Sequence, residues 1–314
     1  MIKPETFEIL ACPRCKIALN NDSCLKCSGC GVEYPIVNGI PVLIDDEKSL
    51  FSVADFVEER NTTYGAPSRG WKKALLKVIP SINLNLGSDK NFKTFFEKVV
   101  EKNAVPRVLI IGGAVEGAGL DTGSVGGAVE LIETDVAFGQ RTGLICDAHD
   151  LPFVSGSFDG VIAQAVLEHV LDPFRCVEEI ERVLRPDGIV YAETPFMQQV
   201  HMGRYDFLRF SHLGHRRLFR NFSEIASGPI GGPGMAMAWT YAFLLRSLFK
   251  NQTLRKAGFA FGSMTGFWLK YLDPFIADRP GAVDAASAFY FMGRRSDGPI
   301  DDRELIAGYR GALQ

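Results

Sequence analysis

Residues 107–195 decide the fold of this chain. They begin RVLIIGG at Arg107, pass through ELIETD and LICDAHDLPF, and end in IVYAETP at Pro195. Short apolar runs rich in Val and Ile alternate here with helical or loop segments (108–111, 129–132, 160–163, 189–192). Such runs are typical of a parallel sheet buried on both faces. The first run ends in Gly112-Gly113, and the second ends in acids about 20 residues on, the spacing of a nucleotide-binding strand–helix–strand unit. The stretch therefore predicts a cofactor-binding α/β sheet.

The amino-acid composition limits the classes of protein to which this chain can belong. The chain has 314 residues, of which 46% are hydrophobic and 23% charged, as in ordinary globular proteins. A formal net charge of −3 argues against a broad nucleic-acid-binding surface. The first residues lack the apolar core of a signal peptide, and no apolar run reaches the roughly 18 residues of a membrane span. We expect a cytoplasmic protein with one large domain and one small one.

Five of the seven cysteines crowd into residues 12–30. Cys12 and Cys15 form one CxxC pair, and Cys27 and Cys30 form another. Two such turns can present four thiolates to one tetrahedral ion. A disulfide framework would need an oxidising compartment, which nothing in the sequence indicates. We therefore predict a structural zinc ion on these four cysteines, with Cys24 as an alternative ligand to Cys27.

The same region carries a family resemblance. ILACPRCK at residues 9–16 and CSGCGVEYPIVNGIPVLI at residues 27–44 resemble the small zinc-ribbon family that includes the activator subunit of tRNA and protein methyltransferases. Asn38-Gly39 predicts a hairpin turn between two strands. The metal would supply much of the folding free energy of so small a unit. We expect a ribbon whose core is separate from that of the following domain.

The central stretch resembles the class I S-adenosylmethionine (SAM)-dependent methyltransferases. The matching motifs are CDAHDLPF, FDGVIAQAVLEHV, EEIERVLRPDG and IVYAETP, within residues 105–196. The resemblance implies a Rossmann-like sheet with helices on both faces, SAM as cofactor, and methyl transfer as the reaction. The expected order is a zinc ribbon over residues 1–50, a connection over 51–90, a methyltransferase domain over 91–297 and a polar tail over 298–314.

The resemblance also implies a set of cofactor-binding residues. Glycines after the first strand would let the backbone approach the amino-acid end of SAM. An acid ending the second strand would bind both ribose hydroxyls, and Asp135 is preferred to Glu133 for this role. The third strand would supply an acceptor for the adenine amino group and a backbone donor, and the fourth a residue near the methionine portion. The predicted positions are Gly112, Gly113, Gly117, Asp135, Asp147, Ala148 and Gln164. One departure is that Ile110 and Ile111 stand where the family usually has an acid.

The segment after Pro195 is expected to form the wall of the substrate pocket, as in related methyltransferases. His201 is a candidate general base, because a neutral imidazole can remove a proton near pH 7. Nearby arginines could hold a carboxylate or phosphate (Arg204, Arg209, Arg216, Arg217). His201, Arg204 or Arg209 is expected at the mouth of the cofactor pocket. For His169, which follows Glu168, a structural role is predicted.

Residues 235–245, MAMAWTYAFLL, predict a buried helix. Covering an apolar substrate and resting on a membrane surface are the alternatives. The sequence as a whole predicts a methyltransferase acting on a small molecule, including sugar- or lipid-linked ones. An RNA or protein methyltransferase that grips its substrate with the ribbon is a second hypothesis. A non-catalytic module whose ribbon recruits a protein partner is a third.

Overall fold

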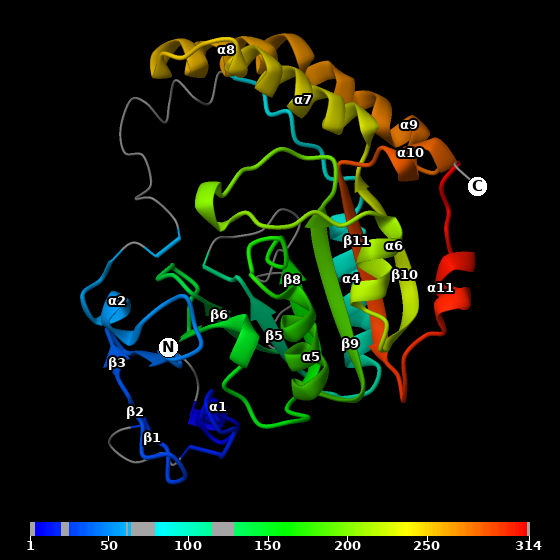
Figure 1. Cartoon of the computed structure of the whole chain (residues 1–314). Helices are drawn as coiled ribbons and strands as arrows, with labels where there is room; N and C mark the ends of the chain where they lie inside the picture. Colours follow the sequence, from blue (N-terminus) through cyan, green and yellow to red (C-terminus); the bar gives the residue numbers. More distant parts are fainter. Residues whose placement is uncertain (1–3, 20–24, 61, 64–78, 115–128, 313–314) are drawn as a thin grey trace.

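The fold is built on one large sheet. The structure, a computed structural model, describes residues 4–19, 25–60, 62–63, 79–114 and 129–312. Nine strands form a sheet in the order β10-β11-β9-β8-β5-β6-β7-β4-β3 (Figure 1). Its central strands are β5 (Arg107–Ile111), β6 (Glu130–Asp135), β7 (Leu144–Cys146), β8 (Phe158–Gln164) and β9 (Leu184–Pro195). These five run parallel, which confirms the predicted α/β sheet.

Helices cover both faces of this sheet. In β5, Val108 and Ile110 point to α4 (Ser88–Val100), where they pack with Phe95. Leu109 and Ile111 point to the opposite face, where α5 (Pro173–Val183) and α6 (His212–Leu218) lie. Successive side chains of a strand alternate between faces, so a strand that is apolar throughout requires a helix on each side.

The N-terminal ribbon joins the large sheet directly. After α1 (Pro4–Phe7), strands β1 (Leu25–Lys26) and β2 (Glu33–Tyr34) pair with each other, and β3 (Ile36–Val37) pairs with β4 (Ile40–Leu43). Asn38 and Gly39 have φ angles of 52° and 78°, as the predicted hairpin requires. Strand β4 also pairs in parallel with β7.

The expectation of two separate cores is therefore wrong. Leu10, Leu25 and Tyr34 of the ribbon belong to the same buried cluster as Phe153 and Leu109 of the large sheet. The physical reason is the edge pairing of β4, which places the apolar face of the ribbon against the sheet's own residues. Short helices α2 (Val53–Val57) and η2 (Ala148–Asp150) lie near this junction.

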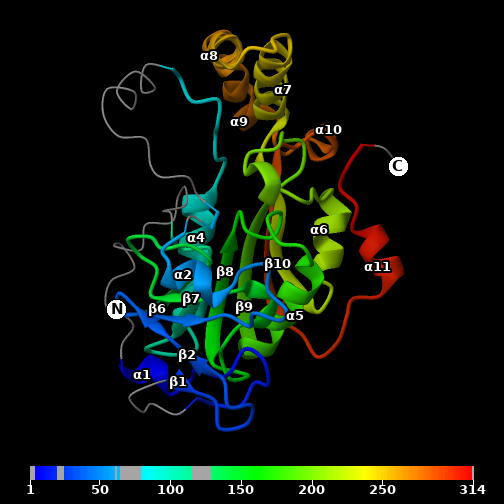
Figure 2. The same cartoon turned by 60° about the vertical axis from the view of Figure 1, so that its left-hand side comes forward.

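The last third of the chain adds two antiparallel strands and a helical projection. Strand β11 (Ala288–Arg295) lies between β9 and β10 (Phe222–Gly231). Helices α7 (Pro233–Ser247) and α8 (Gln252–Gly266), with η4 (Phe267–Leu272) and α9 (Asp273–Ile276), stand beyond one end of the strands (Figures 1 and 2). The remaining elements are η3 (Gly203–Tyr205), α10 (Pro280–Asp284) and α11 (Asp302–Ala307).

The prediction of a buried helix at residues 235–245 is wrong for one face of α7. Ala238 and Ala242 are fully buried, but Met237 and Leu244 are 57% and 58% exposed. In the part of the chain that the structure describes, no helix is long and apolar enough to cross a membrane.

Candidate active site

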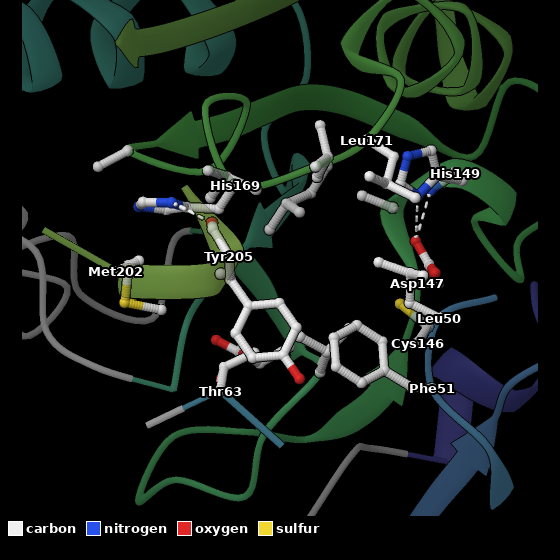
Figure 3. Close-up of a pocket in the computed structure, with 18 residues that line it drawn as sticks. Leu50, Phe51, Thr63, Cys146, Asp147, His149, His169, Leu171, Met202 and Tyr205 are labelled. Carbon is white, nitrogen blue, oxygen red and sulfur yellow. Dashed lines mark hydrogen bonds and ion pairs between the residues drawn. The ribbon is translucent and has the colours of Figure 1, made fainter. Parts of the chain in front are cut away.

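A cavity lies at the carboxyl ends of the central strands (Figure 3). Four of the predicted cofactor residues line it, namely Gly112, Asp135, Asp147 and Ala148. Gly113 follows Gly112 in the same turn, and the backbone N–H groups of both donate to the Thr134 carbonyl at 2.9 Å. Gly117 lies outside the described residues.

Gly112 needs to be glycine. Its φ is +78°, a left-handed conformation that side chains rarely adopt. A Cβ at this position would lie 2.5 Å from Cγ2 of Val166, which also lines the cavity. The strand therefore turns sharply, and the backbone itself forms this part of the cavity wall.

Asp135 ends β6 with its carboxylate at the cavity. One of its oxygens accepts a hydrogen bond from the Ala114 N–H at 2.9 Å. Burial raises the pKa of Asp135 to about 6. Glu133, the alternative acid, is held by Arg141 at 2.9 and 3.0 Å and is not among the residues lining the cavity. The geometry favours Asp135 as the acid that faces a bound ligand.

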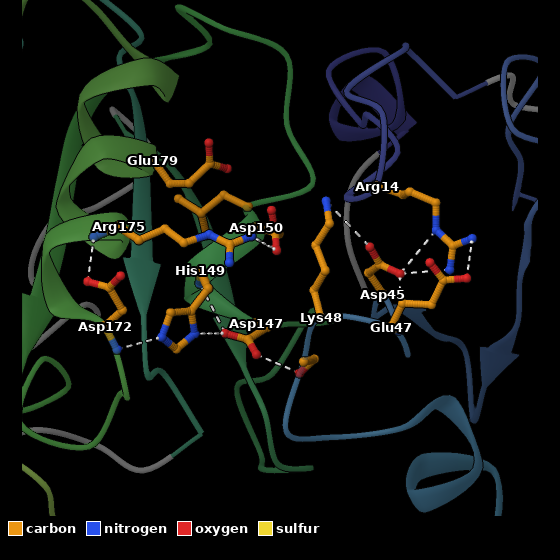
Figure 4. A network of polar contacts seen from close by, with 12 residues as sticks. Arg14, Asp45, Glu47, Lys48, Asp147, His149, Asp150, Asp172, Arg175 and Glu179 are labelled. Atoms are coloured by element: carbon orange, nitrogen blue, oxygen red, sulfur yellow. Dashed lines mark hydrogen bonds and ion pairs between the residues drawn. The ribbon is translucent and has the colours of Figure 1, made fainter.

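Asp147 is held by groups on both sides (Figure 4). The His149 ring nitrogen Nδ1 lies 2.6 Å from one carboxylate oxygen, and the Ser49 hydroxyl donates to the other at 2.5 Å. Nε2 of His149 accepts from the Asp172 N–H at 3.1 Å, which leaves the ring proton on Nδ1. Burial alone would raise the pKa of Asp147, but the bonds from His149 and Ser49 hold it below its ordinary value.

Sequence reasoning missed the residues that close this cavity. Leu50 and Phe51 lie at the boundary between the predicted ribbon and the connection, and Met202 and Tyr205 come from the segment after β9 (Figure 3). The rings of Phe51 and Tyr205 lie 6.0 Å apart. Local patterns carry no signal for this closure, because the two segments are about 150 residues apart and meet only in the folded chain.

A second cavity adjoins the first, and Ala165 lines both. Ala165 has a φ of 53°, which is strained for a residue with a side chain. The polar lining includes Asn83, Asn85 and Glu193, and the apolar lining includes Ile230 and Met235. The predicted site residue Gln164 does not line the first cavity; its amide donates to Glu193 of the second at 3.0 Å.

His201 and Glu168 face each other in the second cavity. Nε2 of His201 lies 3.8 Å from Oε1 of Glu168, and Nδ1 lies 3.4 Å from Oδ2 of Asp206. Burial alone would raise the pKa of Asp206, but the hydrogen bonds from Arg209 and the His201 N–H lower it to about 2. A charged Asp206 favours a proton on Nδ1 of His201 and leaves Nε2 free to accept one.

Glu168 is an unusual buried acid. Neither of its oxygens accepts a hydrogen bond from the residues that the structure describes, and burial raises its pKa to about 8. His169 donates from Nδ1 to the Tyr205 carbonyl at 2.8 Å, as a structural histidine would, and its Nε2 lies 3.6 Å from Glu168. The ligand atoms of Glu168, His169 and His201 lie within 4.8 Å of one another, so they could also hold a divalent metal ion.

The four arginines of this segment have protein partners, and none of them lines the first or the second cavity. Arg209 is bonded to Asp206 and to the Gln198 carbonyl at 2.9 Å, and it lines neither cavity. Arg216 donates to two backbone carbonyls, at Phe219 and Phe222. Arg204 is exposed and lies over the Tyr205 ring, and Arg217 lies over Phe174. Of the three residues expected near the cofactor, only His201 lines a cavity, and that cavity is the second one.

The four predicted zinc ligands lie together. The sulfur atoms of Cys12 and Cys30 are 3.6 Å apart, and those of Cys15 and Cys27 are 3.3 Å apart. Zinc–sulfur bonds of about 2.3 Å in a tetrahedron place ligand sulfurs about 3.8 Å apart. None of the cysteines that the structure describes is in a disulfide, and all four sulfurs lie within 4.8 Å of one another. This donor set fits a structural zinc ion.

Comparisons with known proteins find relatives for both the N-terminal ribbon and the sheet domain. Residues 127–192 match the family described as a methyltransferase domain, and residues 3–39 match the family of Trm112p-like proteins. A UPF0434 protein from Methylobacillus flagellatus is 43% identical over 55 residues, which cover 92% of that protein and 17% of this chain. The chain joins a Trm112p-like segment to a segment of the methyltransferase-domain family.

Two further similarities involve the methyltransferase domain. An uncharacterised chloroplastic methyltransferase from Arabidopsis thaliana is 32% identical over 125 residues, or 32% of this chain, and the chain spans about a third (34%) of its length. A putative sarcosine dimethylglycine methyltransferase from Galdieria sulphuraria superposes with a TM-score of 0.44 and 14% identity, covering 67% of this chain and 85% of that one. Ser49, which follows the Trm112p-like segment, donates a hydrogen bond to Asp147 at the first cavity.

Proposed function

We propose that the whole chain transfers a methyl group from SAM to a small acceptor bound in the second cavity. The observation that carries this proposal is the meeting of the two cavities at Ala165. SAM, when bound, supplies an electrophilic methyl group. The first cavity fits it, because Gly112 leaves room for close approach and Asp135 offers a carboxylate to the ribose hydroxyls.

The chain's own contribution is to position the reactants. Asp135 and Asp147 hold the nucleoside end, while Leu50, Phe51 and Tyr205 exclude water from it. Holding two reactants in line supplies a large part of the rate enhancement in such a displacement. A base is needed only when the acceptor atom carries a proton, and His201 is placed to take it on Nε2.

The second cavity indicates the kind of acceptor. Its amides and carboxyl groups, from Asn83, Asn85, Glu168 and Glu193, suit the hydroxyl groups of a sugar-like molecule. Ile230 and Met235 on the same wall suit an apolar portion. Both features support a small acceptor with a polar head and an apolar part.

The experiment that tests this function uses SAM labelled in its methyl group. The purified chain is incubated with labelled SAM and a cell extract, which is then separated into small molecules, lipids, RNA and protein. We expect label in the small-molecule or lipid fraction. Label in RNA or protein would overturn the proposed acceptor class.

His201→Gln should lower the rate of methyl transfer by about a hundredfold or more, because general-base catalysis typically contributes that much. SAM affinity, measured by calorimetric titration, should change little, because His201 does not line the first cavity. Arg204→Gln, a neighbouring exposed residue, is the matched control and should leave the rate unchanged. If chelation abolishes the rate and Mn²⁺ restores it while zinc does not, the three side chains around Glu168 hold a metal and His201 is not the base.

A further inference from the structure

The hairpin formed by α7 and α8, with η4 and α9, exposes an unusual amount of apolar surface. We call residues 233–276 the helical hairpin. Nine large apolar side chains that are half exposed or more lie within it, against seven in all other described residues. They are Met237, Leu244, Leu248, Leu254, Phe261, Met264, Trp268, Tyr271 and Phe275, with Phe275 at 75%. Exposed apolar side chains gathered on one element in this number indicate an interaction site.

The exposed side chains follow the helical repeat. On α7 and its end, Met237, Leu244 and Leu248 are spaced by seven and four residues, so they share one face. On α8 and η4, Leu254, Phe261 and Trp268 recur every seven residues. Each helix therefore presents a continuous apolar stripe to its surroundings.

The two helices pack through small residues and leave the large ones outside. Gly258 and Gly262 of α8 lie against α7, and Gly266 continues the four-residue spacing. A Cβ on Gly262 would lie 2.6 Å from Cα of Ala242, so the two backbones almost touch. Helix pairs inside membranes pack in this way, because in lipid the large apolar side chains need no protein partner.

The net charge of the hairpin is opposite in sign to that of the rest of the chain. Residues 233–276 contain five Lys or Arg and one acid, the buried Asp273. The hairpin therefore carries +4, and the remainder of the chain carries −7, because the total is −3. Lys270 is used internally, because its ammonium donates to the Ser81 and Asn83 carbonyls. The other four cations, Arg246, Lys250, Arg255 and Lys256, surround the turn between α7 and α8.

We propose that the helical hairpin rests in the headgroup layer of an anionic membrane and that the methyl acceptor is lipid-linked. Each helix has 15 residues, or about 22 Å, which is shorter than the roughly 30 Å hydrocarbon layer. The hairpin therefore lies in the interface, with apolar stripes in the lipid and cations among anionic headgroups. The lipid-linked acceptor rests on the proposed function of the second cavity.

The position of the second cavity supports this acceptor. Met235, in the first turn of α7, lines the cavity, and so does Asn83, whose side chain accepts a hydrogen bond from Trp239 of α7 at 2.8 Å. The base of the hairpin is thus part of the cavity wall. A lipid headgroup at the membrane surface would reach the second cavity without leaving the bilayer.

Vesicle flotation tests whether the helical hairpin binds an anionic membrane. The full chain is mixed with vesicles of phosphatidylcholine alone, or with about 30% phosphatidylglycerol, and the bound fraction is measured. We expect binding to the anionic vesicles. The triple variant Phe261→Ser, Trp268→Ser, Phe275→Ser should bind about tenfold more weakly or worse. The matched control Val105→Ser, Val200→Ser, Ile306→Ser alters equally exposed side chains elsewhere and should bind like the wild type.

Charge is tested separately. Arg255→Gln with Lys256→Gln should weaken binding to anionic vesicles about thirtyfold, because each of the two cations contributes about 1 kcal/mol near an anionic surface and each 1.4 kcal/mol corresponds to a factor of ten. Lys90→Gln with Lys93→Gln, on exposed positions of α4, is the control and should have no effect. Calorimetric titration with SAM checks that each variant is folded, because none of these positions lines the first cavity.

The outcomes separate the two proposals. Wild-type chain that binds SAM but neither kind of vesicle would overturn the membrane proposal alone. A dimer in light scattering that the triple variant dissociates, or RNA retention lost in the Arg255 and Lys256 variant without vesicle binding, would also overturn it. Vesicle binding without SAM binding would instead overturn the proposed function and leave the hairpin's role intact.

Discussion

Asp135→Ala is expected to weaken SAM binding at least tenfold. A hydrogen bond to a charged group contributes about 1.5–3 kcal/mol, and each 1.4 kcal/mol corresponds to a factor of ten in affinity. Asp135 ends β6 at the first cavity and would accept from both ribose hydroxyls. Calorimetric titration with SAM measures the change directly.

Two variants give this test its controls. Glu133→Ala should change SAM affinity little, because Glu133 is paired with Arg141 rather than with the cavity. Asp147→Ala should cost less than Asp135→Ala, because the neighbouring backbone donor at Ala148 remains. Wild-type chain that gives no heat with millimolar SAM would favour the non-catalytic module. If the Asp135→Ala variant still binds SAM tightly, another residue contacts the ribose.

The same carboxylate predicts a pH dependence. Because the pKa of Asp135 is raised to about 6, its carboxylate is charged at pH 7.5 and mostly protonated at pH 5. The hydroxyl donors of the ribose prefer the charged form. SAM affinity should therefore fall about tenfold between pH 7.5 and pH 5. Asp135→Asn should lose this slope, and an unchanged slope in that variant would assign the titration to another group.

Removal of zinc is expected to destabilise the large sheet as well as the ribbon. Zinc supplies about 10–16 kcal/mol to the folding of isolated zinc-finger peptides. Here Cys12 and Cys27 are fully buried in the same cluster as Phe153 and Leu144, so loss of the ion disturbs a shared core. Hydrogen exchange should show lost protection in β4 and in its partner β7.

Elemental analysis gives the matching measurement. The native chain should contain one zinc per molecule, and Cys12→Ser should contain much less. Cys24→Ser is the control and should keep the ion, because Cys24 is not one of the four proposed ligands. Loss of zinc in the Cys24→Ser variant would show that Cys24 is one of the zinc ligands. Two separate unfolding steps in calorimetry, with the second unaffected by zinc, would show that the cores act independently.

A short segment of the chain, residues 45–51, connects the ribbon strands to the first cavity. Asp45 is bonded to Arg14 at 2.8 Å, and Ser49, four residues later, donates to Asp147 (Figure 4). Leu50 and Phe51 then line the cavity itself. The segment that follows the ribbon strands thus contributes contacts to the cavity proposed to bind SAM, and zinc loss should lower SAM affinity together with stability.

Local patterns were enough to predict several features of this protein. Apolar runs placed the central strands, because a strand buried on both faces has few alternatives to a continuous apolar sequence. The two CxxC pairs placed the metal ligands, because each short turn determines the geometry of its own two sulfurs. The family resemblance implied the acids Asp135 and Asp147, and both lie at strand ends and line the first cavity.

Only the tertiary structure decided the remaining features, because they depend on segments that are distant in the sequence. The pairing of β4 with β7 merged the ribbon core with that of the sheet, which no periodicity within residues 1–50 indicates. His201 meets Glu168 only because the segment after β9 folds back against the residues that follow β8. The apolar sequence of α7 does not reveal that its partner α8 presents glycines instead of large side chains. Burial is a property of what packs against a residue, so the exposed hairpin could be recognised only in the folded chain.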